Sequence, residues 1–567
     1  MLRIFRFGCA LLITAATASK TSAETFVSFT NISDRLNFRT KGDFHGAAWL
    51  DYDRDGKQDL FVTNGPSHSY PPALYHNLGE GTFANVTVPA GLAEFSRLSG
   101  VVTGDLDNDG YEDILLSGDS SRIFVNNNSS VRVLRNQGNG TFANVTADAG
   151  ITGLESPGSS ALADVDGDGL LDLFMTATGS IGTRTQHPSR FYRNLGNFRF
   201  ADVTVDSGVD AALGACATGF SDYDRDGDAD LFVANCNDTS FRTTPMQLFR
   251  NDGHFQFTDV SEAAGLKSQL GFWMGIAFAD YNNDGNIDVF STNLGTTGAN
   301  QPHGLFENNG DGTFSNVASE VGVADWEFGW GTAFQDFDND GFADIAFAGT
   351  LDGFVGAGTG NPGRLFANQL GSSNPAQTFA NVSANLNIDL SATNTSGVAQ
   401  GDFNNDGFSD LIIMAYDSSN RQNATVLLQN DGNDNHWLGI DLEGTLSNRD
   451  AVGARVTVLS DQRTLTQEIY AGSSFLSSDS KSLRFGLGDE SAVNSIRVHW
   501  PSGLQEKFLD PGGVDQIVKL VEGTGIAIPE SSTLLLGMLG LAAALALRVP
   551  CVKLLKLKRE ATNGDWL

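Results

Sequence analysis

The stretch DYDRDGKQD at residues 51–59 decides the fold of this chain, because its pattern returns six more times along the sequence. The further copies start at Asp105, Asp164, Asp222, Asp280, Asp336 and Asp402. All seven fit the form D-x-[DN]-x-D-G-x-x-D, and successive copies begin 54 to 66 residues apart. A pattern that recurs at so steady a period predicts a repeat architecture.

Each copy carries the donor atoms of a loop that binds a hard cation. Positions 1, 3, 5 and 9 hold Asp or Asn, and position 6 is always Gly. Calcium takes six to eight oxygen ligands from carboxylates, carbonyls and water, and a glycine lets the loop turn back sharply on the ion. Position 7 varies widely in side chain, which predicts that its backbone carbonyl is the ligand.

The sequence therefore predicts up to seven calcium ions, mainly structural, with one in each loop. The predicted metal ligands are Asp51, Asp53, Asp55, Lys57, Asp59; Asp105, Asp107, Asp109, Tyr111, Asp113; Asp164, Asp166, Asp168, Leu170, Asp172; Asp222, Asp224, Asp226, Asp228, Asp230; Asp280, Asn282, Asp284, Asn286, Asp288; Asp336, Asp338, Asp340, Phe342, Asp344; and Asp402, Asn404, Asp406, Phe408, Asp410.

The residues around each loop exclude an EF-hand. Position 12 is apolar, as at Val62 and Leu116, where an EF-hand has a bidentate Glu. Gly-Ala-Ala-Trp-Leu precedes the first loop and Leu-Phe-Val follows it, so the loop is predicted to join two strands. An Asp-rich surface turn is the alternative interpretation of one copy, but seven copies in register favour cation binding.

A second pattern completes each repeat. It first runs from Leu74 to Thr87, where an Asn-x-Gly turn between apolar runs predicts a hairpin. Each repeat then offers four strands, and seven such units predict a seven-bladed β-propeller. The seventh unit has no fourth strand after Asn430. The segment Thr25–Thr30 is predicted to supply that strand and to tie the last repeat to the first.

The Asp loops and the Asn-x-Gly-x-Gly-Thr-Phe hairpins resemble FG-GAP/VCBS repeats, the units of the integrin α-chain propeller. The resemblance covers residues 24–435. It implies a calcium-binding propeller and leaves the biological role open.

Residues 436–523 carry short β-like runs that predict a small all-β, sandwich-like domain. The stretches Ser447–Ala454, Phe485–Gly488 and Val498–Gly503 resemble the ASPIC/UnbV domain. That domain follows such propellers in the family of cartilage acidic protein and its bacterial relatives. The predicted fold class is therefore all-β, with a seven-bladed β-propeller followed by the small domain.

Both ends of the chain have the features of export and sorting segments. Residues 1–23 place Arg3 and Arg6 before an apolar stretch and end on Thr-Ser-Ala, which is typical of a secretory signal peptide. Within residues 524–567, Pro-Glu-Ser, an apolar run and a basic end resemble a PEP-CTERM sorting signal. The resemblance implies an exosortase-type processing enzyme, transient membrane engagement through the tail, and the cell surface or extracellular matrix of a Gram-negative bacterium. A plain C-terminal membrane anchor is the alternative.

The charge balance limits the partners of this protein. Against 35 Lys and Arg stand 68 Asp and Glu, which gives a formal net charge of −33. Seven divalent cations carry 14 positive charges and would bring this charge to −19. Nucleic acids and anionic membrane surfaces are bound through basic patches, so the composition excludes nucleic acid as a partner.

Two cysteines remain in the body of the chain between the end segments. Cys216 lies six residues before the fourth loop and Cys236 lies six residues after it. In a hairpin folded about that loop the two come opposite each other, which predicts a disulfide. Two buried free thiols are the alternative.

The sequence has no Gly-x-Ser-x-Gly, His-Glu-x-x-His or Cys-x-x-Cys motif. We therefore expect a non-enzymatic adhesion or extracellular-matrix binding protein whose ligand is an extracellular protein or glycan. The alternative is an extracellular polysaccharide-acting enzyme with its site at the propeller channel. Trp273, Trp326, Phe328 and Trp330 precede the fifth and sixth loops, where they either line that channel or pack between blades.

Overall fold

The computed structural model describes residues 26–528 apart from 37, 39–41, 43, 66–69, 119–130, 153, 155–156, 178–187, 210–213, 237–242, 295–301, 325–328, 350–362, 372–377, 389–392, 418–421 and 510. The signal peptide, the sorting motif from Pro529 onward, Trp326 and Phe328 lie outside the described residues. Within the described ranges the chain is all-β. No helix there is both long and apolar enough to cross a membrane.

Apart from the two-stranded pair β16 (Thr244–Pro245) and β19 (Leu270–Gly271), the strands up to residue 430 form antiparallel sets of four, and the described residues contain seven such sets. Two sets are joined into one eight-stranded sheet through the single pair Asn64 and Leu98. The first strands of the sets are β2 (Phe44–Leu50), β6 (Leu98–Gly104), β10 (Pro157–Ala163), β14 (Ala215–Ser221), β20 (Trp273–Ala279), β24 (Gly329–Gln335) and β28 (Thr393–Gly401). The second strands are β3 (Asp59–Asn64), β7 (Asp113–Gly118), β11 (Asp172–Ala177), β15 (Asp230–Asn235), β21 (Asp288–Asn293), β25 (Asp344–Gly349) and β29 (Asp410–Asp417).

The outer half of each set is the hairpin predicted from the Asn-x-Gly pattern. The third strands are β4 (Ala73–Asn77), β8 (Val131–Asn136), β12 (Arg190–Asn194), β17 (Gln247–Asn251), β22 (Gly304–Asn308), β26 (Arg364–Asn368) and β30 (Val426–Asn430). The fourth strands are β5 (Phe83–Asn85), β9 (Phe142–Asn144), β13 (Phe200–Asp202), β18 (Phe257–Asp259), β23 (Phe314–Asn316), β27 (Phe379–Asn381) and β1 (Phe29–Asn31). Short helices follow three of these fourth strands: α1 (Thr146–Ala149), α2 (Thr204–Ser207) and α3 (Ala318–Val321).

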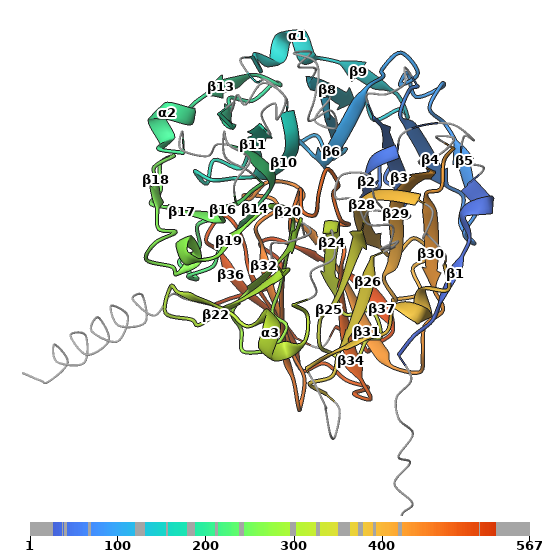
Figure 1. Cartoon of the computed structure of the whole chain (residues 1–567), viewed down its shortest axis with the longest axis vertical. Coiled ribbons are helices and arrows are strands. Elements are labelled where there is room, and N and C mark those ends of the chain that lie inside the picture. Colours follow the sequence, from blue (N-terminus) through green and yellow to red (C-terminus); the bar gives the residue numbers. More distant parts are fainter. Residues whose placement is uncertain are drawn as a thin grey trace, which may run out of the picture.

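The sets follow one another around a ring (Figure 1). The first strand of each set lies against the first strand of the next, and β28 of the last set contacts β2 of the first. The core lies between neighbouring sets. In one cluster Trp49 and Tyr75 of the first set pack with Phe403 and Leu427 of the last. An aromatic side chain buries 150–250 Å², so this packing holds adjacent sets together.

The N-terminal strand completes the last set. β1 pairs antiparallel with β30, with Phe29 opposite Asn430 and Asn31 opposite Leu428. The strand begins at Phe29, four residues later than the predicted segment. Phe29 is 1% exposed, and its ring meets the edge of Phe337 at 6.1 Å between centroids.

Two further sheets make up the C-terminal module, which we define as residues 436–528. The first has the order β34 (Leu483–Gly488), β31 (His436–Glu443) and β37 (Gln516–Val521). The second has the order β33 (Thr464–Glu468), β32 (Arg455–Leu459), β35 (Ser495–His499), β36 (Gln505–Leu509) and β38 (Ile526–Ala527). Both sheets contribute to one hydrophobic core around Trp500, and this core continues into the ring through Val102 and Leu162.

One segment of the module lies in the centre of the ring. We call residues 470–480 the central segment, and its residues 471–478 are all buried. Backbone hydrogen bonds join it to several first strands, among them Leu162 to Ala471 at 2.8 Å and Ser478 to Ala47 at 2.9 Å. A Cβ at Gly46 would lie 2.0 Å from the carbonyl oxygen of Leu476, so this inner strand must carry glycine there. No pattern in the sequence predicts that the module enters the ring.

Replacing Phe29 by Ala should lower the free energy of unfolding by about 3–5 kcal/mol, because it empties a core site between the sixth and seventh sets. Denaturant unfolding midpoints measure the effect. Leu195→Ala is the control, since Leu195 is 51% exposed and its truncation should change the free energy by about 0.5 kcal/mol or less. Equal midpoints for the two variants would contradict the role assigned to β1.

Candidate metal centres

Each Asp loop connects the first strand of a set to the second. Position 1 directly follows the first strand, as Asp51 follows β2, and position 9 is the first residue of the second strand, as Asp59 begins β3. The position-6 glycines all have positive φ values, between 81° and 99°. Position 4 also lies in the left-handed region, where Asn and Gly are favoured and Arg is not. It is Asn or Gly in five loops, but Arg54 and Arg225 occupy it in the first and fourth.

Backbone amides hold the position-1 carboxylate in the same way in every loop. In the first loop Asp51 Oδ1 accepts from the N–H of Asp55 at 3.0 Å, and Oδ2 accepts from Gly56 at 2.9 Å. The carboxylate of Asp55 in turn accepts from the N–H of Lys57 at 2.9 Å. These bonds curl the loop and point its carboxylates inward.

The structure brings the predicted carboxylates together. In the second, third and fourth loops, oxygen atoms of positions 1, 3 and 9 lie within 4.8 Å of one another. In the first loop Asp51, Asp53 and Asp55 form such a group, and Asp53, Asp59 and His76 form a second one. In the fifth to seventh loops the position-9 carboxyls Asp288, Asp344 and Asp410 are raised in pKa by burial and then by the other carboxylates of their own loops.

The donor set fits a hard cation. Oδ1 of Asp53, of Asp107 and of Asp166 is buried and has no hydrogen-bond partner among the described residues. A buried, unpaired carboxylate oxygen is costly unless it binds a cation. With aspartate oxygens at positions 1, 3, 5 and 9, each of these loops supplies the all-oxygen environment that calcium prefers.

Burial also changes the proton affinity of these groups. Burial, together with a smaller effect of neighbouring carboxylates, raises the pKa of Asp59 to about 8 and the pKa of Asp105 to about 7. Burial likewise raises the pKa of Asp164, Asp222 and Asp280 to about 7. A bound divalent cation would supply the positive charge that keeps these carboxylates ionised.

The loops are not equivalent. Arg135 Nη2 lies 2.8 Å from Asp107 Oδ2 in the second loop. His76 occupies the equivalent position on the third strand of the first set, and its Nδ1 lies 3.1 Å from Asp59 Oδ1 of the first loop. In the seventh loop position 3 is Asn404, whose amide donates to Asp406 Oδ2 at 2.7 Å. Affinity for calcium follows the number of charged ligands, so we expect loops with Asn at position 3 to bind it more weakly.

Seven asparagines that sequence reasoning assigned only to turns connect neighbouring loops. Each is the last residue of a third strand and is at most 2% exposed. Asn251 shows the arrangement. Its N–H donates to Asp230 of its own loop at 2.8 Å, and its Nδ2 donates to the carbonyl of Val165 in the preceding loop at 3.0 Å.

We call these seven residues the clasp asparagines. Their Nδ2 contacts to position 2 of the preceding loop are 2.7 to 3.0 Å long: Asn77 to Phe403, Asn136 to Tyr52, Asn194 to Leu106, Asn251 to Val165, Asn308 to Tyr223, Asn368 to Tyr281 and Asn430 to Phe337. The contact from Asn77 to Phe403 closes the circle between the first and last sets. The only sequence signal was the fixed place of this Asn at the end of every third strand, since the partner carbonyl can belong to any residue type.

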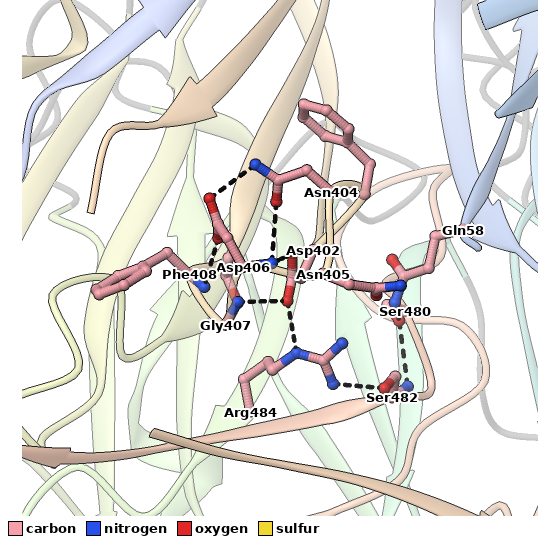
Figure 2. Close-up of polar contacts among 12 residues, drawn as sticks. Gln58, Asp402, Asn404, Asn405, Asp406, Gly407, Phe408, Ser480, Ser482 and Arg484 are labelled. Atoms are coloured by element: carbon pink, nitrogen blue, oxygen red, sulfur yellow. Dashed lines mark hydrogen bonds and ion pairs between the residues drawn. The ribbon is translucent and has the colours of Figure 1, made fainter. Parts of the chain in front are cut away.

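The C-terminal module covers the loop side of the ring. Asp450 Oδ2 accepts from the N–H of Asp105 in the second loop at 2.8 Å. Arg484 Nε donates to Asp402 Oδ2 in the seventh loop at 2.8 Å, on an oxygen that also accepts from Gly407 (Figure 2). Arg484 is 3% exposed, so this contact is fully desolvated. The module therefore docks on the loops themselves.

The structure also places the aromatic group and the cysteines. Trp273 is 2% exposed and packs between the fourth and fifth sets. Of the two predictions for this residue, packing between blades therefore holds, and lining of the channel does not. Trp330 packs on Phe475 of the central segment, with ring centroids 4.8 Å apart. Cys216 and Cys236 are joined in a disulfide with Cα atoms 5.6 Å apart.

Comparisons with known proteins agree with this organisation. The model of the FG-GAP-like repeat matches residues 28–116, 122–175 and 222–291, and the model named ASPIC and UnbV matches residues 444–527. Human (Homo sapiens) cartilage acidic protein 1 is 25% identical over 487 residues, which cover 81% of this chain and 69% of that protein. The T-cell immunomodulatory protein of Rattus norvegicus is 28% identical over 173 residues, or 27% of each chain.

Among solved structures, the V. cholerae biofilm matrix protein Bap1 is aligned over 86% of this chain and 71% of its own, with 12% identity and a TM-score of 0.29. Because this score is low, the likeness carries no argument.

Replacing Asn251 by Ala should lower the free energy of unfolding by about 2–3 kcal/mol, because it removes buried hydrogen bonds to Val165, Ala229 and Gly253. Asn309→Ala is the matched control, since Asn309 is exposed and, among the described residues, its side chain bonds to Thr313 and Ser315 alone. Chemical denaturation measures both. A loss no larger than that of the control would show that the clasp contact does not contribute to the free energy of unfolding.

In protein stripped of metal, the free energy of unfolding should fall as the pH rises from about 4 to about 8. The pKa values of loop aspartates such as Asp59, Asp105 and Asp164 are higher in the folded chain than the ordinary 3.8. The folded state therefore holds extra protons in this pH window, and ionisation of these carboxyls opposes folding. Saturating calcium should remove most of this slope, because bound carboxylates stay ionised. Denaturant unfolding at about pH 5 and about pH 8 tests the sign, and a higher stability of the stripped protein at the upper pH would refute it.

Proposed function

We propose that this chain, which carries FG-GAP-like repeats and a C-terminal ASPIC and UnbV domain and is homologous to cartilage acidic protein 1 over most of its length, is an exported, calcium-stabilised adhesion or matrix-binding protein. The observation that carries the proposal is the convergence of buried, unpartnered carboxylate oxygens in loops repeated around the ring. Such a scaffold presents a large rigid surface, which suits binding.

We assign the ring to a seven-bladed β-propeller and the two-sheet module to a sandwich. The assignment is supported by the four-strand sets, by the contact of β28 with β2 and by the pairing of β1 with β30. Closure of this kind leaves only short, protected edges.

Calcium in this proposal is structural. The loops lie under the C-terminal module, with Asp105 and Asp402 contacted directly by Asp450 and Arg484. Ions held there would neutralise the carboxylates and stabilise both the ring and the docking of the module. A ligand would then bind to the surface that the ions stabilise.

Export to the cell surface or matrix of a Gram-negative bacterium, with processing of the tail by an exosortase-type enzyme, remains part of the proposal. It rests on the sequence of the two ends of the chain. The enzyme alternative requires an open channel, whereas the buried central segment occupies the centre of the ring. Because the central segment fills the centre of the ring, the structure favours binding over catalysis at the channel.

Adding calcium to metal-stripped protein should raise the melting temperature sharply. An ion that binds only the folded state contributes about 2.7 kcal/mol per site at a hundredfold excess over Kd. Differential scanning calorimetry with and without calcium measures the shift, and magnesium at the same concentration is the control because it demands a tighter octahedral site. An identical melting temperature in EDTA and in calcium would show that calcium does not stabilise the folded protein.

A glycan and cell-binding array separates binding from catalysis. The proposal expects retention on at least one extracellular glycan or protein, lost in EDTA, without release of product. Release of saccharide fragments that is abolished by a substitution in the ring outside the loops would favour the enzyme instead.

A further inference from the structure

A polar cleft lies between the first loop and the C-terminal module. Its volume is about 360 Å³. The first loop lines one side, and the strands β31 and β37 with residues 449–450 and 480–484 of the module line the other. The cleft therefore exists only when the module is docked.

The lining of this cleft has six positively charged side chains against five carboxylates, a slight positive excess in a chain whose formal charge is −33; the carboxylates are Asp51, Glu112, Asp441, Glu443 and Asp450. The six cations are Arg54, Lys57, Arg449, Lys481, Arg484 and Lys519. Three of the six are already neutralised, and one of these is Lys57, whose Nζ lies 2.5 Å from Asp55 Oδ2. Lys481 contacts the carboxylates of Glu112 and Asp450, and Arg484 is bound to Asp402.

The outer cations are less completely paired. Glu443 accepts contacts from both Lys519 and Arg449, the latter at 2.5 Å, and its pKa is lowered mainly by Lys519, with smaller effects of Arg449 and Arg54. Three cations thus share one carboxylate. Arg449 Nε is buried without a hydrogen-bond partner among the described residues, and Lys519 keeps 55% of its side chain exposed. An anion entering here would meet the exposed ammonium group of Lys519, which it would share with Glu443.

The walls of the cleft suit a sugar. Gln58, Asn405, Ser480 and Ser482 supply neutral hydrogen-bonding groups beside the cations. Apolar side chains are a minority of the lining, so a fatty or aromatic ligand is a poorer match. With calcium in the first loop, the negative charge of Asp51 would also be cancelled.

We propose that this cleft binds the acid groups of an anionic polysaccharide, either carboxylated or sulfated. The inference rests on the proposed binding function and adds the ligand class and the place. The module then has a role beyond packing, since it supplies Arg449 and Lys519 while the ring supplies Arg54.

The test uses the mature protein in calcium, with hyaluronate fragments as the carboxylated probe, dextran sulfate as the sulfated probe and unmodified dextran as the neutral control. Two variants remove charge from the cleft. Lys519→Glu reverses an exposed cation. Arg54→Asn replaces a left-handed residue by the one found at the same position in four other loops, so this variant should fold at least as well as the parent.

Each variant has a matched control elsewhere. Lys267→Glu makes the same charge change at a side chain that is 51% exposed. Arg225→Asn makes the same loop substitution in the fourth loop, where φ is 63°. Neither residue lines the cleft.

We expect the parent to bind at least one acidic probe and not dextran, with affinity that falls as salt rises. Lys519→Glu and Arg54→Asn should each weaken binding about tenfold, and the two controls by less than about twofold. Calorimetry or biolayer interferometry measures this, and melting in calcium checks folding. The proposal is overturned if neither acidic probe binds better than dextran, or if the cleft variants bind as tightly as their controls. Binding of another ligand on the array would then leave the broader function standing, whereas an empty array would remove both.

Discussion

Repulsion among buried carboxylates is the constraint on which this structure depends. Each loop places several aspartates in a partly dehydrated space, and burial raises the pKa of groups such as Asp59 and Asp105 far above the ordinary value. An acidic loop of this kind is stable only if protons, backbone amides or a cation balance the charge. The amides supplied by each glycine turn provide part of that balance, and the unpartnered oxygens of Asp53 and Asp107 indicate where a bound cation would complete it.

The same constraint connects one loop to the next. A clasp asparagine receives its position from the position-9 aspartate of its own loop and bonds to a carbonyl of the preceding loop, so the geometry of one loop bears on its neighbour. Asn77 and Phe403, which are 326 residues apart in sequence, make the contact that closes this chain of interactions. Loop chemistry and ring closure are therefore parts of one arrangement.

The C-terminal module depends on the loops in turn. Asp450 and Arg484 contact the first residues of the second and seventh loops, and the central segment fills the middle of the ring. Ring and module share the core around Trp500. The charged cleft beside the first loop arises only from this docking, which joins cations from both parts. A binding surface built from two parts of the chain is a natural consequence of covering the loop side with a second domain.

The sequence by itself determined everything that depends on short-range pattern. The Asp loops, the strands around them, the hairpins, most strands of the module and the facing of Cys216 and Cys236 follow from spacing and from residue type within about sixty residues. It placed β1 in the last set but four residues too early, because a three-residue strand has little pattern of its own. The tertiary structure alone decided the partners of the clasp asparagines, the burial of residues 471–478 inside the ring and the contact of Arg484 with Asp402. Backbone carbonyls and inner glycines accept such partners whatever the local sequence, so no local signal specifies them.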